Sequence, residues 1–189
     1  MAKRKTGTKK SKTTKSEPGV PAKQVAADWV EENGYRVAAA AAVPVPVPGA
    51  HTALCTALEA YMISNIAKIY GRTLTIGECV ALVPTLGGAV VVGKTVSSIV
   101  GELVGWIPFA GWAAKGAVGG ATAYGIGKAA IHWFESKHPG QDAAPFETVS
   151  LRDFLHDALG ELGVKKGDAK KAAEAVADDV EEKDEPDDE

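Results

Sequence analysis

The sequence predicts an all-α protein, a helical bundle built on a glycine- and alanine-rich helical hairpin, with a disordered tail at each end. Apolar residues recur at helical spacing in several long segments, which indicates amphipathic helices. Hydrophobic residues make up 46% of the chain, but aromatic residues only 6%, and glycine occurs 21 times. A chain of this composition buries surface through close approach of backbones more than through large side chains.

The two tails carry opposite charge, although the net charge is only −3. The last dozen positions, from Asp178 to Glu189, are mostly acidic, with Lys183 as their single positive charge. Neither end holds the apolar residues that would offset the entropy of ordering, so we expect both ends to be disordered. The basic tail spans residues 1–20, and its positive charges are Lys3, Arg4, Lys5, Lys9, Lys10, Lys12 and Lys15.

Between the tails, a helical module is expected over residues 21–138. A linker at 139–149, C-terminal helices at 150–180 and an acidic tail at 181–189 follow it. Pro21 suits a helix start, and Asn33-Gly34 is expected to end a first short helix that begins at Ala22. An Ala-rich segment then leads into the proline-rich stretch VPVPVPG, which is expected to be extended.

Five later helices are predicted from periodicity and capping signals. Thr75 and Glu78 form a capping box at the start of the second of these helices, and Pro84 is expected to kink it. Ser150 and Asp153 cap the fourth. The predicted ranges are 52–70, 76–106, 111–136, 151–162 and 168 to about 180.

Small residues recur every four positions in the helices predicted at 76–106 and 111–136. Such a series forms a flat stripe that lets two helices approach closely, as is common in lipid and also occurs in soluble bundles. The series are Gly93, Ser97, Gly101 and Gly105 on the first helix, and Ala113, Ala117, Ala121, Gly125 and Ala129 on the second.

The same hairpin has the length and hydrophobicity of a marginal membrane insertion. A span needs about 20 mostly apolar residues. The stretch Val80–Gly101 is interrupted by Lys94 alone, and Trp106–Ile131 by Lys115 and Lys128. Tryptophan is common at membrane interfaces, and three tryptophans are placed as interface anchors: Trp106, Trp112 and Trp133.

Residues Gly88–Thr95 match the phosphate-loop pattern G-x-x-x-x-G-K-[ST]. A phosphate loop needs a non-helical turn after a strand. Here three successive valines fill the turn, and a capped helix precedes it. We therefore interpret the match as coincidental and expect no nucleotide or other cofactor.

No catalytic or metal-binding constellation is apparent. The histidines show no metal-ligand spacing, and the two cysteines are read as free thiols. His51 and Cys55 are four residues apart and could touch on one helix, but no acid orients them. His132 and Glu135 are read as a polar face at a helix end.

The order of several motifs resembles a known family. These motifs are AAAAAVPVPVPGAHTAL, LEAYMISNIAKIYGRTLT, LGGAVV and WIPFAGWAAKGAVGGATAYGIGKAAIHWFE. Together they resemble the domain of unknown function 697, the YcjF-like, GTPase-associated family. The resemblance covers residues 36–135 and leaves the fourth later helix outside. It implies an all-helical module that is often membrane-associated and often linked to a GTPase, without catalysis of its own.

Two functional hypotheses follow. The first is a non-catalytic, membrane-associated module with both tails on the cytoplasmic side, acting with a GTPase or another partner protein. The second is a soluble helical adaptor whose charged tails bind protein or nucleic acid. The basic tail lacks interleaved aromatic residues and so gives little support for nucleic acid. The small-residue stripes could equally join two copies of the chain.

Overall fold

The computed structural model describes residues 19–43, 50–92 and 111–182, with side chains except at 89–92, 111–119 and 179–182. Every named element within these ranges is a helix, which confirms the predicted all-α class. The helices are α1 (Ala22–Ala42), α2 (Ala50–Ile69), α3 (Ile76–Val92), α5 (Gly111–Lys137), α6 (Leu151–Glu161) and α7 (Lys166–Glu182). Both charged tails fall mainly outside the described residues, so their predicted disorder stays a prediction.

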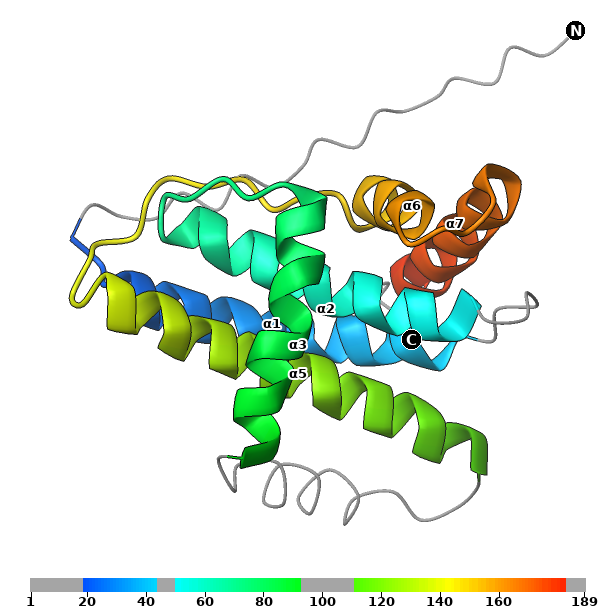
Figure 1. The fold of residues 1–189 in the computed structure, drawn as a ribbon, viewed down its shortest axis with the longest axis horizontal. Coiled ribbons are helices and arrows are strands. Elements are labelled where there is room, and N and C mark those ends of the chain that lie inside the picture. Colours follow the sequence, from blue (N-terminus) through cyan, green and yellow to red (C-terminus); the bar gives the residue numbers. More distant parts are fainter. Residues whose placement is uncertain (1–18, 44–49, 93–110, 183–189) are drawn as a thin grey trace, which may run out of the picture.

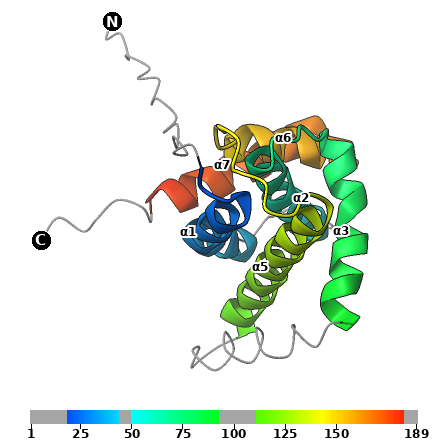
Figure 2. The ribbon, with the colours of Figure 1, turned by 90° about the vertical axis from the view of Figure 1, so that its left-hand side faces the viewer.

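Helix α2 lies at the centre of the bundle, and α1, α3, α5 and α6 pack around it (Figures 1 and 2). Its residues from Ala50 to Ala67 contain a single Asp, Glu, Lys or Arg, namely Glu59. A helix that is apolar all round is typically buried on every side. Leu54, Leu58 and Ile66 accordingly have no exposed surface.

Helix α1 packs against α5 in the antiparallel sense. Glu31 of α1 accepts a hydrogen bond from Lys128 of α5 at 3.0 Å, whereas Ala38, later in α1, meets Gly120, earlier in α5. The backbones come close there, because a Cβ built on Gly120 would lie 2.4 Å from the Cβ of Ala38. Glycine is therefore required at this crossing.

The predicted break at Asn33-Gly34 is wrong, because α1 continues through both residues to Ala42. The Asn33 side chain donates to the Trp29 carbonyl oxygen at 2.9 Å, which satisfies it inside the helix. A Cβ on Gly34 would lie 3.0 Å from the Tyr124 ring of α5. Packing against α5 thus outweighs the weak helix propensity of the pair.

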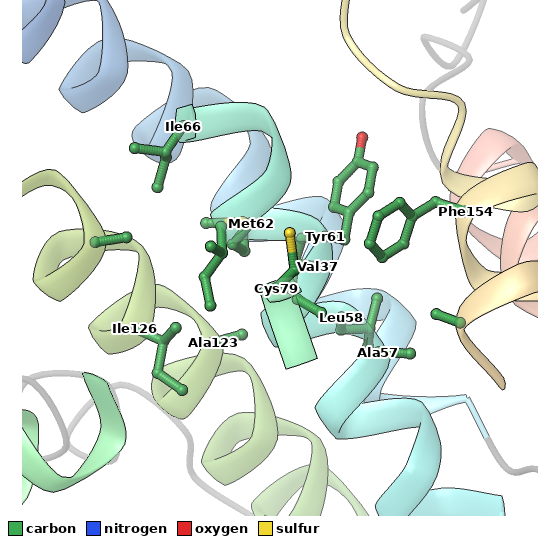
Figure 3. Packing of buried hydrophobic residues seen from close by; sticks show 14 of the residues in the cluster. Val37, Ala57, Leu58, Tyr61, Met62, Ile66, Cys79, Ala123, Ile126 and Phe154 are labelled. Carbon is green, nitrogen blue, oxygen red and sulfur yellow. The ribbon is translucent and has the colours of Figure 1, made fainter. Parts of the chain in front are cut away.

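Helices α6 and α7 form a second layer over α1 and α2 (Figure 2). Tyr61 of α2 points toward Phe154 of α6 (Figure 3), and their ring centroids are 5.6 Å apart. One hydrophobic cluster contains residues from each of the described helices, from Ala22 of α1 to Val176 of α7. Ser150 caps α6 as predicted, by accepting a hydrogen bond from the Asp153 N–H.

The capping box at the start of α3 is also present. The Thr75 Oγ1 accepts from the Glu78 N–H at 3.3 Å, and Glu78 Oε2 accepts from the Thr75 N–H at 2.8 Å. Replacing Thr75 by alanine removes the side-chain cap, so we expect a loss of about 1 kcal/mol in unfolding free energy. Urea unfolding of T75A measures this loss. The exposed Thr73 serves as the control, and an equal loss in T73A would contradict the assignment of the cap.

Candidate functional site

The part of the phosphate-loop pattern that the structure describes is helical. Gly88 to Val92 lie in the last turns of α3, whereas Gly93, Lys94 and Thr95 lie outside the described residues. Backbone N–H groups within a helix run along its axis and cannot converge on a phosphate as they do in a nest. This geometry agrees with the interpretation of the motif as coincidental.

His51, Cys55 and Glu59 follow one another at intervals of one turn along α2. The Cys55 Sγ lies 3.8 Å from the His51 Nε2, so the predicted contact is present. Burial raises the pKa of the Cys55 thiol, and the charge of Glu59 raises it further. Because the thiolate is the reactive form, this environment does not activate Cys55 as a nucleophile.

Glu59 is the unusual member of this row. Its exposed fraction is 8%, and burial raises the pKa of its carboxyl to about 7. The other buried polar side chains in the described residues have partners. Asn33 bonds to Trp29, Ser64 bonds to Cys79, and Asn65 bonds to Tyr61 and Val149. Glu59 was not among the predicted site residues, although a lone acid in an apolar stretch of helix was a usable signal.

A second polar cluster ties the segment after α5 to the end of α2. Glu135 of α5 accepts from the Tyr70 hydroxyl at 3.1 Å and from the Gly140 N–H at 3.0 Å. The hydrogen bond from the Gly140 N–H is the main reason that the pKa of the Glu135 carboxyl lies below its usual range, and the bond from the Tyr70 hydroxyl lowers it further. Gln141 then donates to the Tyr70 carbonyl oxygen at 3.0 Å. These hydrogen bonds give Glu135 a structural role. His132, which lies on the same helix, is exposed.

Among the residues the structure describes, no group of three or more His, Cys, Asp or Glu side chains is placed to hold a metal ion. The same residues contain no disulfide, and Cys55 and Cys79 are both free thiols, as the sequence suggests. Cys79 of α3 has no exposed surface, and burial raises the pKa of its thiol to about 12.

The predicted small-residue series is only partly within the described residues. Ala121 and Gly125 are buried on α5, and Ala129 is partly buried against the core. Two glycines outside the series also make close approaches. These are Gly120, against Ala38, and Gly127, where a Cβ would lie 2.9 Å from the Met62 Cε. Gly93, Ser97, Gly101 and Gly105, and the side chains of Ala113 and Ala117, lie outside the description, so the series stays a prediction.

Of the three predicted interface tryptophans, the structure describes the side chain of Trp133 alone. Trp133 is partly buried at the end of α5, with its ring 4.8 Å from that of Phe134. The Lys137 ammonium lies over the Trp133 ring at 4.8 Å. Trp106 and the side chain of Trp112 lie outside the part of the chain that the structure describes. Within the described ranges, no helix combines the length and the hydrophobicity that crossing a membrane requires.

The family described as "Domain of unknown function (DUF697)" matches residues 7–161. The chain belongs to this family. The match confirms the resemblance drawn from residues 36–135, and it is wider, because it includes α6, which the sequence interpretation left outside. Alpha-helical packing throughout the described residues agrees with the helical module that membership implies.

This DUF697 member is also similar to the Magnetosome membrane protein 22 of Magnetospirillum gryphiswaldense. The two sequences are 29% identical over 163 residues, which cover 82% of each chain. No solved structure matches the chain.

Proposed function

We propose that this DUF697 member is a non-catalytic, membrane-associated helical module that works with a partner protein, such as a GTPase. The observation that carries the membrane part is the uncharged character of α3. From Cys79 to Val92 the helix contains no Asp, Glu, Lys or Arg. The similarity to a protein named as a magnetosome membrane protein supports the same proposal.

The arrangement of helices places the two ends of the apolar segment 93–110 where it could contact a membrane. The last turn of α3 and the first turn of α5 project on the same side of the bundle (Figures 1 and 2). The sequence that joins them, residues 93–110, is rich in apolar residues and carries Lys94 and Glu102 as its only charges. We therefore propose that the membrane contacts this side of the bundle.

The charged tails supply the electrostatic part of the proposal. A lysine or arginine near an anionic membrane surface contributes about 1 kcal/mol to binding. We propose that the basic tail contacts anionic headgroups on the cytoplasmic side, while the acidic tail stays in solvent. The GTPase link that the sequence resemblance implies is the basis for proposing such a partner. The described residues contain no catalytic constellation that would argue for an activity of the module itself.

The test is fractionation of the full-length chain followed by alkaline carbonate washing of the membranes. We expect the protein to stay in the washed pellet, because an apolar contact persists when electrostatic contacts are released. The variant Ile99→Asp/Leu103→Asp places two charges in the segment between α3 and α5 and should release the protein. The matched control Asp157→Asn/Glu161→Gln changes two exposed charges on α6 and should leave retention unchanged.

Two other results would change the proposal. Release by high salt alone would reduce the membrane contact to the basic tail. Recovery as a folded helical protein in the soluble fraction would overturn insertion and favour the adaptor hypothesis.

A further inference from the structure

Glu59 is placed on the helix where an ionised carboxylate is most costly. Helix α2 is contacted by α1, α3, α5 and α6, and 14 of its 20 residues are buried. Met62, one turn after Glu59, packs against Gly127 of α5. Ser64 pairs with Cys79 of α3 on another side of α2. Glu59 therefore lies within the packed part of the bundle rather than on a solvent-facing stripe.

The charged groups on the helices around Glu59 act on other residues. The charge of Arg36 on α1 acts on Tyr61. On α6, Arg152 pairs with Asp178 at 2.8 Å and His156 with Asp157 at 3.0 Å. On α5, Lys128 pairs with Glu31 of α1 at 3.0 Å. On α3, Glu78 bonds to Thr75, and the thiol of Cys79 is protonated.

On α2 itself, Cys55 is a neutral thiol, and the exposed His51 contacts Cys55. No described side chain gives Glu59 a hydrogen bond or a salt bridge. An unpaired charge in such a place is strongly unfavourable, so the carboxyl takes up a proton instead.

Protons can still reach this group. No side-chain oxygen or nitrogen that is fully shielded from solvent lacks a partner among the described residues. The unpaired Glu59 carboxyl consequently keeps a small contact with solvent, in agreement with its exposed fraction of 8%. It can therefore equilibrate with the pH of the medium without prior unfolding.

We infer that Glu59 is a proton-controlled switch for the packing around α2: the closed bundle holds the carboxyl protonated, and its ionisation favours an opened arrangement in which the carboxylate is fully hydrated. In the closed state the Glu59 carboxyl binds a proton. In the open state the same carboxyl has an ordinary pKa and releases that proton. Closure is therefore favoured at low pH and weakens as the pH rises toward and beyond 7. The inference goes beyond the membrane proposal and stands without it.

The chain offers a reporter of opening, because it contains only two cysteines. In a Cys55→Ser background, Cys79 is the single thiol, and it is fully covered in the closed bundle. The rate of thiol labelling, divided by that of a peptide with the same flanking sequence at each pH, measures the open fraction. Between pH 5.5 and pH 8 we expect this ratio to rise by about tenfold or more, since opening is linked to loss of one proton.

Glu59→Gln copies the protonated carboxyl and should label slowly, with a ratio that does not change with pH. The matched control is Glu32→Gln, which neutralises an exposed acid of α1 and should keep the rise seen in the parent. A flat ratio in the parent, or an equal rise in Glu59→Gln, would overturn the switch.

Carbon-13 titration of the Glu59 carboxyl in the unmodified chain tests the premise without any variant. A midpoint near the ordinary value of 4.5 would also overturn the inference.

Discussion

Replacing Gly120 by alanine is expected to lower the free energy of unfolding by about 2–4 kcal/mol, because the added methyl group overlaps α1. Its Cβ would lie 2.4 Å from the Cβ and 2.7 Å from the Cα of Ala38. These two atoms are part of the α1 backbone or attached directly to it, so they cannot move away by a rotamer change as the end of a long side chain could. The two helices must therefore separate at their crossing. Urea unfolding monitored by tryptophan fluorescence measures the loss.

Gly160→Ala is the matched control, since Gly160 is also helical and has no atom within 4 Å of the added Cβ. There we expect no loss and a gain of up to about 1 kcal/mol from better helix propensity. The double variant Gly120→Ala/Ala38→Gly should recover part of the stability, because it removes the methyl group that is struck. Equal stability of G120A and G160A would contradict the close approach of α1 and α5.

Replacing Asn65 by alanine is the second change with a large expected effect. Asn65 has no exposed surface, and its Oδ1 accepts from the Val149 N–H at 3.0 Å, just before the cap of α6. Its Nδ2 donates to the Tyr61 carbonyl oxygen at 3.0 Å. The substitution leaves the Val149 N–H without this partner and opens a small cavity. We expect a loss of about 2–3 kcal/mol, together with faster hydrogen exchange of the Val149 amide.

Tyr61→Phe provides the comparison for Asn65→Ala. The Tyr61 hydroxyl donates to the Val149 carbonyl oxygen at 3.1 Å, on the same peptide segment. Its removal deletes one hydrogen bond and keeps the ring that packs on Phe154, so about 1 kcal/mol should be lost. A larger loss in Y61F than in N65A would show that Asn65 does not anchor this segment.

The local parts of the fold could be predicted from the sequence. The capping box opens α3 and Ser150 caps α6, both as predicted from the neighbouring residues. These features depend on hydrogen bonds between residues a few positions apart, which sequence patterns record well. The break predicted at Asn33-Gly34 is absent, because the helix is held there by packing against Tyr124, which lies far along the chain.

The candidate site was harder to predict for the same reason. A helical period assigns Leu58 and Met62 to a buried face, and it would assign Glu59 to a polar one. Only the packing of four helices around α2 shows that this helix has no polar face at that level. Similarly, Gly120 and Gly127 permit close approaches that are identified by their partners Ala38 and Met62 and not by their spacing.

The pairing of α1 with α5 has a consequence for synthesis of the chain. Glu31 and Lys128 are 97 residues apart, so the ribosome must produce α2 and α3 before α1 can reach its main partner. During that interval the nascent chain presents the apolar surfaces of α1 and α2 without their covering helix. Exposed apolar surface of this kind favours aggregation and recruits chaperones. We therefore expect this protein to depend on assisted folding until α5 has emerged.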